Sequence, residues 1–191
     1  MPITTFFKLV EIQTKLASFF PFLLGTLFAA YYFNAFNLIN TLIFFVAMLI
    51  FDMTTTAINN LMDYQKAKDN GYKDEVNVIG QEKISEKLVI RLIIGMLIVA
   101  MLLGFLLVFR TNIILLVIGA GCFFIGIFYT FGPIPISRMP LGEPISGLVM
   151  GFGIFFIAAF VNVKDTNLLS LLFSKQSFII EGNLVSILSL F

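Results

Sequence analysis

The sequence contains no histidine and no tryptophan, and it has only one cysteine and few charged residues. Charged side chains make up 12% of its 191 residues, whereas an average soluble domain has about 25%. The absence of histidine excludes zinc sites with His ligands and Ser-His-Asp catalysis, and the single Cys122 excludes a disulfide framework. A formal net charge of +1 gives no electrostatic basis for nucleic-acid binding. Any ion site must therefore use oxygen ligands.

Apolar side chains are abundant instead. Hydrophobic residues make up 59% of the chain, with 24 phenylalanines, and the mean hydropathy is +1.02. A soluble fold of this size cannot bury so much apolar surface, so we expect an all-α, polytopic transmembrane helix bundle surrounded by membrane lipid. A spanning helix needs about 20 mostly apolar residues. Five stretches qualify, at residues 16–33, 38–62, 92–109, 113–131 and 141–163.

A sixth apolar stretch covers residues 177–191, where the sequence ends. It is too short to cross a bilayer and it contains Glu181. We therefore expect residues 1–191 to form a single transmembrane domain that is incomplete at its C-terminus, with five full spans and a partial sixth.

Lysine and arginine are distributed unequally between the two ends of the predicted bundle. Nine of the 12 lie on the side of the N-terminus, and the positive-inside rule predicts that this side faces the cytoplasm. The same side carries the long, highly charged loop at residues 63–91. The nine residues are Lys8, Lys15, Lys66, Lys68, Lys73, Lys83, Lys87, Arg91 and Arg138.

The second stretch carries a polar stripe on an otherwise apolar helix. At 100° per residue, Asp52, Thr56, Asn59 and Asp63 fall within an arc of about 60°. Asp52 lies about three turns from Asp63, inside the bilayer, where a carboxylate is expected to face the bundle interior or a wet cavity. Helix packing explains Thr56. For Asp52, helix packing and substrate binding are equally good explanations, so both interpretations stay open.

The cytoplasmic end of this helix gathers oxygen-bearing side chains. Asn59 and Asp63 are followed by Asp69, with Lys66 and Lys68 between. Carboxylates and a side-chain amide suit Mg²⁺, which commonly bridges one or two carboxylates to substrate phosphates. We therefore predict that Asn59, Asp63 and Asp69 are metal ligands and catalytic residues. The two lysines suit the remaining phosphate charge, although ordinary positive-inside flanking explains each of them equally well.

Residues 129–143, YTFGPIPISRMPLGE, contain too many prolines and glycines to continue a helix. The segment is either a stiff turn or a cap over a cavity mouth, where Arg138 meets an anionic substrate group. Glu143 pairs with Arg138 or with a lysine of the long loop in these interpretations, and Tyr129 offers a cation–π face. Downstream, Gly147, Gly151 and Gly153 are predicted to allow close helix approach.

These two segments carry a family resemblance. Residues 59–69, NNLMDYQKAKD, resemble the first Asp-rich motif of the UbiA superfamily of intramembrane prenyltransferases, with departures at Asn60, often Asp, and Ala67, often Gly. Residues 129–133 and 141–143 resemble a second segment of the branch that prenylates 1,4-dihydroxy-2-naphthoate. The resemblance implies Mg²⁺-dependent transfer of a polyprenyl group from its diphosphate to an aromatic acceptor. It implies the menaquinone pathway, a bacterial-type plasma membrane and a nine-helix fold.

The resemblance also implies a second Asp-rich motif after the sixth helix, beyond the last residue of this sequence. We therefore expect the chain alone to be inactive. Two other interpretations stay open. One is a small transporter or channel, with Asp52 and Asp63 along an ion path. The other is a non-catalytic fragment.

Overall fold

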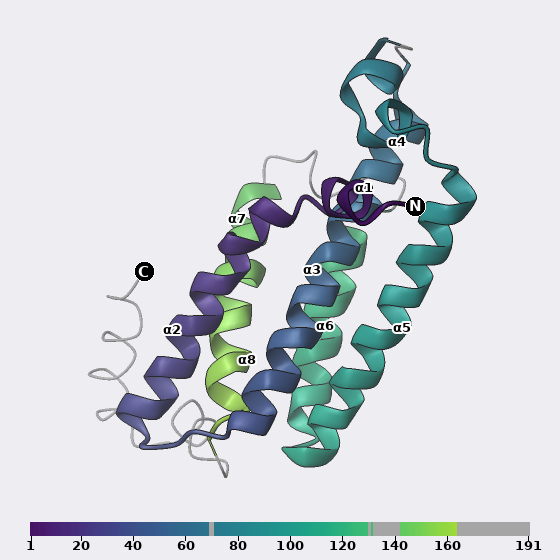
Figure 1. Cartoon of the computed structure of the whole chain (residues 1–191). Helices are drawn as coiled ribbons and strands as arrows, with labels where there is room; N and C mark the ends of the chain where they lie inside the picture. The colour runs from purple at the N-terminus through teal and green to yellow at the C-terminus, as the bar shows by residue number, and fades with distance from the viewer. Residues whose placement is uncertain (69–70, 130, 132–141, 164–191) are drawn as a thin grey trace.

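The computed structural model describes residues 1–68, 71–129, 131 and 142–163, and the regular elements within these ranges are all helical (Figure 1). The all-α prediction is therefore confirmed. In chain order the elements are α1 (Ile3–Leu9), η1 (Ile12–Lys15), α2 (Leu16–Tyr32), α3 (Leu38–Lys66), η2 (Tyr72–Val76), α4 (Val78–Gln81), α5 (Glu86–Arg110), α6 (Ile114–Phe128), α7 (Gly142–Ser146), η4 (Gly147–Gly153) and α8 (Ile154–Phe160).

Four helical segments of the described chain are long and apolar enough to cross a membrane. They are Ile12–Tyr32, Leu38–Lys66, Glu86–Arg110 and Gly142–Phe160, the last of which joins α7, η4 and α8. The fifth predicted stretch forms α6, a shorter apolar helix of 15 residues. Asn112 fixes its start, because its side-chain oxygen accepts from the backbone N–H of Ile114 at 3.0 Å. The predicted sixth stretch, residues 177–191, lies outside the described residues.

Two of the helices extend further than hydropathy alone predicts. α3 continues to Lys66 rather than ending at residue 62, and α5 begins at Glu86 rather than at residue 92. Charged residues occupy both extensions, and hydropathy therefore places them in the loop although they are helical. The long loop is shorter as a result, and it contains η2 and α4.

The helices pack in two groups. α3 packs along α5, which connects by a short turn to α6, and α2 packs along α8 (Figure 1). Gly25 sets the α2–α8 spacing, because a Cβ there would lie 2.2 Å from the backbone oxygen of Phe155. By contrast, a Cβ at Gly147 or Gly151 would meet nothing within 4 Å among the described residues, so no close approach is seen at these two glycines.

A buried polar cluster joins α3, α5 and α8 at the end of the bundle opposite the long loop. Asn162 Oδ1 accepts from Thr41 Oγ1 at 2.8 Å and from the backbone N–H of Asn37 at 2.7 Å. Asn40 donates to the backbone oxygen of Val161 at 2.9 Å and accepts from Arg110 Nε at 2.8 Å. These hydrogen bonds satisfy polar groups in an otherwise apolar setting, and they connect the ends of α3, α5 and α8.

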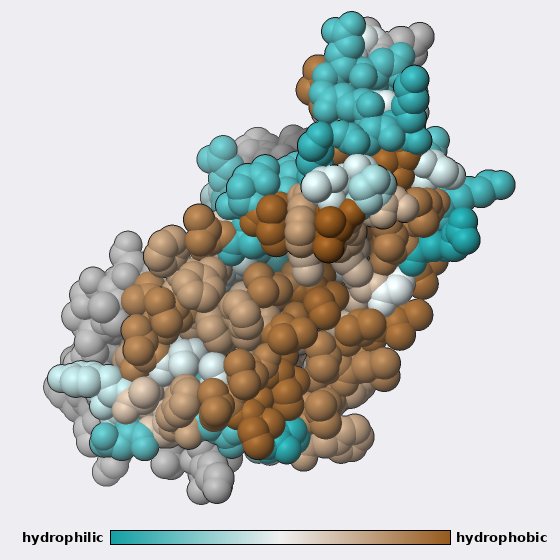
Figure 2. All heavy atoms as spheres, in the orientation of Figure 1, coloured by the Kyte–Doolittle hydropathy of each residue, from teal (hydrophilic) through white to brown (hydrophobic). Residues whose placement is uncertain are grey.

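The other end carries α1, α4 and the charged loop. Lys8 pairs with Glu82 at 2.5 Å and Thr5 donates to the same carboxylate at 3.1 Å, which ties α1 to the residue that follows α4. Figure 2 shows hydrophilic residues gathered around this loop and hydrophobic residues along the visible side of the bundle. The molecule is therefore an integral membrane protein with a strongly polar cap at one end.

Candidate functional site

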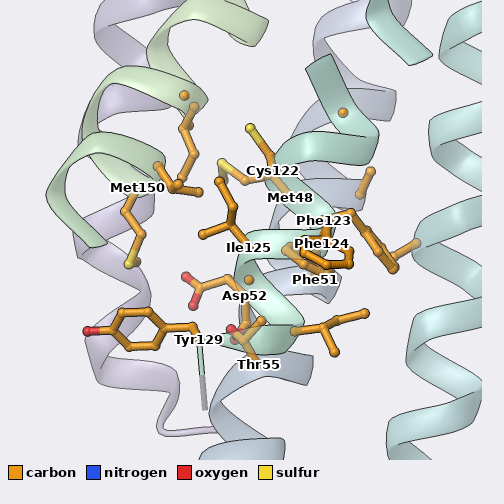
Figure 3. Close-up of a pocket in the computed structure, with 18 of the residues that line it drawn as sticks. Met48, Phe51, Asp52, Thr55, Cys122, Phe123, Phe124, Ile125, Tyr129 and Met150 are labelled. Carbon is orange, nitrogen blue, oxygen red and sulfur yellow. The ribbon is translucent and has the colours of Figure 1, made fainter. Parts of the chain in front are cut away.

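A cavity of about 850 Å³ lies between α3, α6 and η4, with α5, α8 and the η1 segment completing its wall. Most of its lining is apolar. Met48 and Phe51 of α3 face Cys122 and Phe123 of α6, and Met150 of η4 completes this side (Figure 3). The rings of Phe51 and Phe123 stack with their centroids 4.4 Å apart.

The polar part of the lining comes mainly from α3. Asp52, Thr56, Asn59 and Asp63, the predicted stripe, all line the cavity. They occupy successive turns of one helix face, so the stripe descends from the loop end into the apolar interior. The cavity is therefore amphiphilic, with polar groups toward one end and a hydrophobic chamber beyond them.

The interior end of the stripe holds a buried ion pair. Lys15 Nζ lies 2.9 Å from Asp52 Oδ1, and the two side chains are only 6% and 11% exposed. Lys15 also donates to Thr56 Oγ1 at 2.6 Å, and Ser18 Oγ donates to Asp52 Oδ2 at 2.6 Å. We call Lys15, Ser18, Asp52 and Thr56 the inner polar cluster.

Sequence reasoning missed Lys15 as a site residue, because it counted this lysine among the flanking cations. The tertiary fold brings it to Asp52, which lies 37 residues further along the chain. A cation placed directly before an apolar helix can either stay in solvent or turn inward. Only the acidic residue inside α3 hints at a buried partner, because a carboxylate within the bilayer requires compensation.

The end of the cavity toward the charged loop, which we call its mouth, is lined by Asn59, Asn60 and Asp63 of α3 and by Glu11 and Thr14 from the segment before α2. Asn60 Nδ2 donates to the backbone oxygen of Leu9 at 2.9 Å and to Glu11 Oε1 at 3.3 Å. Asn77 in turn donates to the backbone oxygen of Asn60 at 2.9 Å. Asn60 therefore ties the end of α1 to α3 and holds the Glu11 carboxylate at the edge of the cavity.

The structure brings some of the predicted site residues together and leaves others apart. Tyr129 lines the cavity and donates to the backbone oxygen of Gly142 at 3.3 Å. Lys66, Lys68 and Glu143 are exposed and do not contribute to the cavity lining. Asp69 and Arg138 lie outside the described residues. The proposed roles of these five residues stay predictions.

The mouth offers only part of a metal site. The described part of the chain holds no group of three or more His, Cys, Asp or Glu side chains suited to an ion. Asn59 and Asp63 nevertheless line the same cavity one helical turn apart, and both offer oxygen atoms. An amide and a carboxylate on one helix face fit part of the coordination of a hard cation.

Comparisons with known proteins show the family of the chain. The profile of the UbiA prenyltransferase family matches residues 18–180. A relative described as "1,4-dihydroxy-2-naphthoate octaprenyltransferase", from Bacillus subtilis (strain 168), is 30% identical over 180 residues. The alignment covers 92% of this chain and 56% of the relative, so the chain spans little more than half the length of that protein. No solved structure matches the chain significantly.

Proposed function

This chain belongs to the UbiA prenyltransferase family, and from that premise we propose that its cavity binds a polyprenyl diphosphate for transfer to an aromatic acceptor. We propose 1,4-dihydroxy-2-naphthoate as the acceptor, since the relative from Bacillus subtilis is named for it. The step would belong to menaquinone biosynthesis in a bacterial-type plasma membrane. Both substrates reach the site from the membrane or its surface, which fits an intramembrane cavity.

One observation carries this proposal: the cavity is polar at its mouth and apolar in its interior. Asn59 and Asp63 stand at the mouth, and Met48, Phe123 and Met150 line the chamber beyond. A prenyl diphosphate has the same asymmetry, with an anionic head and a long hydrocarbon chain. Burying the chain against apolar walls is favourable by about 25 cal/mol per Å² of apolar surface removed from water.

The mouth residues supply ligands for the divalent cation that such a head requires. We propose that Asn59 and Asp63, together with Asp69, hold Mg²⁺, and that Lys66 and Lys68 take part of the remaining phosphate charge. When bound, Mg²⁺ neutralises the diphosphate and makes it a better leaving group. Glu11, held by Asn60, adds a further carboxylate at the edge of the same mouth.

The cavity walls would act on the reacting groups. In the transfer, the C–O bond breaks and its electron pair leaves with the diphosphate, and the ring carbon that bears the carboxylate bonds to the prenyl carbon. The carboxylate then leaves as CO2, and the electrons of its C–C bond return to the ring. Positive charge develops on the allylic carbon, and the faces of Phe51, Phe123 and Tyr129 are placed to stabilise it by cation–π interaction.

Binding of a short prenyl diphosphate tests the proposal directly. We expect the purified chain in lipid nanodiscs to bind farnesyl diphosphate in the presence of Mg²⁺ and to lose this affinity in EDTA. Asp63→Asn removes an anionic ligand while keeping the side-chain shape, and should weaken Mg²⁺-dependent binding by about 10-fold or more. The measurement is equilibrium binding of the labelled diphosphate.

Asp74→Asn is the matched control, because Asp74 is exposed in η2 and does not line the cavity. Equal affinities of the two variants at low Mg²⁺ would contradict the ligand assignment. Ion flux into liposomes without any prenyl compound would instead favour the transporter interpretation of Asp52 and Asp63.

A further inference from the structure

The inner polar cluster has a hydrogen-bonding pattern that restricts what it can bind. A lysine ammonium has three N–H donors. Lys15 directs them at Asp52 Oδ1, at Thr56 Oγ1 and at the backbone oxygen of Asp52, at 2.9, 2.6 and 3.3 Å. The cation is thus fully engaged within the protein, and it offers no donor to a molecule in the cavity.

The Asp52 carboxylate, by contrast, has hydrogen-bond acceptor positions that no described residue fills. The carboxylate has about four acceptor positions, and the described residues fill two of them, from Lys15 on Oδ1 and from Ser18 on Oδ2. Figure 3 shows the carboxylate pointing away from α3, into the space bordered by Ile125, Tyr129 and Met150. Because one ammonium pairs with one carboxylate, the inner polar cluster is electrically neutral. Its remaining acceptor positions are available to a group in the cavity.

A neutral ion pair with spare acceptor positions suits a ligand group that donates a hydrogen bond. It does not suit a second anion, because the Lys15 charge is already balanced by Asp52. The neighbouring walls are aromatic, with Phe51 stacked on Phe123. The chemistry of this part of the cavity therefore fits a ring that bears a hydroxyl group.

We propose that Asp52 accepts a hydrogen bond from the ring hydroxyl of the aromatic acceptor that is not adjacent to the acceptor's carboxylate, and so orients its ring, with Lys15 and Ser18 as positioning residues that fix the Asp52 carboxylate. This inference rests on the proposed prenyl transfer and deepens it, because it separates the two substrates along α3. Asp52 and Asp63 are eleven residues apart, which corresponds to about 16 Å along a helix. The diphosphate would bind at the mouth and the hydroxylated ring further in.

The test compares two acceptor compounds that differ only at the hydroxyl groups. One is 1,4-dihydroxy-2-naphthoate, kept reduced, and the other is 1,4-dimethoxy-2-naphthoate, which has no hydroxyl to donate. In nanodiscs, the unaltered chain should bind the dihydroxy compound about 10- to 100-fold more tightly, the range expected for a hydrogen bond to a charged group. Equal affinities would overturn the inference without any variant.

Two variants locate the preference at Asp52. In Lys15→Met with Asp52→Leu, apolar side chains replace both ions, so no buried charge is left unpaired. This double variant should bind the two compounds equally while keeping its affinity for farnesyl diphosphate. Ser18→Ala frees one carboxylate oxygen to turn, and should reduce the preference several-fold without changing diphosphate affinity.

Asp63→Asn is the control at the mouth, and it should keep the hydroxyl preference while losing diphosphate affinity. A double variant that retains the full preference would show that the inner polar cluster is only structural, and the proposed prenyl transfer would still stand. If the unaltered chain bound neither farnesyl diphosphate nor the naphthoate, the proposed function would fail and this inference with it.

Discussion

Lys15 lies at the start of an apolar helix in the sequence, yet in the fold it is one of the most buried polar side chains. Its position relative to α2 is predictable, but its partner is not, because Asp52 belongs to another helix. Asn60 is a similar case. The sequence shows only a departure from the family motif, whereas the structure shows that Asn60 donates to the backbone oxygen of Leu9 and to the Glu11 carboxylate at the edge of the cavity.

Glu82 gives a pH-dependent test at the residue scale. Its hydrogen bond from Lys8, and then that from Thr5, lowers the pKa of Glu82 below its usual value. Because the pKa of Glu82 is lower in the folded state, its contacts with Lys8 and Thr5 contribute their full stabilisation at pH values above the ordinary glutamate pKa of about 4.3. This stabilisation is lost as the pH falls through the lowered value. We therefore expect hydrogen-exchange protection of α1 and α4 to decrease over that range, after correction for intrinsic rates.

Glu82→Gln removes the titrating group and should abolish this pH dependence, leaving protection low at every pH. Glu75→Gln serves as the control, because Glu75 is exposed in the same loop. A Glu82→Gln chain that still lost protection on acidification would show that another group is responsible.

At the scale of elements, hydropathy identifies where the spanning helices lie but not how they pack. All four long helices and α6 overlap predicted stretches, since apolar runs are required by the bilayer. The polar stripe on α3 was also predictable, because its spacing follows the helical repeat. The small residue that sets the α2–α8 contact was not predictable, because many glycines are present and only the fold selects Gly25.

Substitution at Gly25 tests this packing. Gly25→Ala places a methyl group against the backbone of Phe155 and close to Ala158 Cβ, at 2.2 and 2.9 Å. Because a backbone atom cannot move aside, we expect a loss of about 1–3 kcal/mol in unfolding free energy. Reversible denaturation in mixed micelles measures it.

Gly95→Ala in α5 is the matched control, since a Cβ there meets nothing within 4 Å. The control should be neutral or stabilising, because alanine has about 1 kcal/mol better helix propensity than glycine. Equal stability of the two variants would mean that α2 and α8 do not approach as closely as described.

At the scale of the whole molecule, hydrophilic residues gather around the charged loop at one end of the bundle (Figure 2), and the polar residues Asn59 and Asp63 line the cavity toward that end. The fold class follows from the composition, the family from the resemblance of two motifs, and the α3 face of the candidate site from the helical spacing of its polar residues. The inner polar cluster, the contacts of Asn60 with Leu9 and Glu11, and the cavity itself do not follow, because each depends on contacts between segments distant in the sequence. Asp69 and Arg138 belong to segments outside the described residues, so their roles stay predictions.

The orientation of this polar end in the membrane can be tested with a single cysteine. We predict that it faces the cytoplasm, since most lysines and arginines lie there. Lys73→Cys in a Cys122→Ala background should resist an impermeant maleimide added to intact cells and react after the cells are opened. Thr111→Cys, at the α5–α6 turn, is the control and should show the reverse pattern. Rapid labelling at position 73 from outside would overturn this orientation.

The most direct test of the central claim is to map where a prenyl diphosphate binds. A farnesyl diphosphate analogue with a diazirine at the end of its hydrocarbon chain would be photolysed on the chain in nanodiscs with Mg²⁺, and the adducts located by mass spectrometry. The account predicts adducts on the chamber residues Met48, Cys122, Phe123 and Met150, which decrease sharply in Asp63→Asn. Adducts confined to exposed positions of α5 such as Ile94 and Leu102, unchanged by Asp63→Asn, would contradict it.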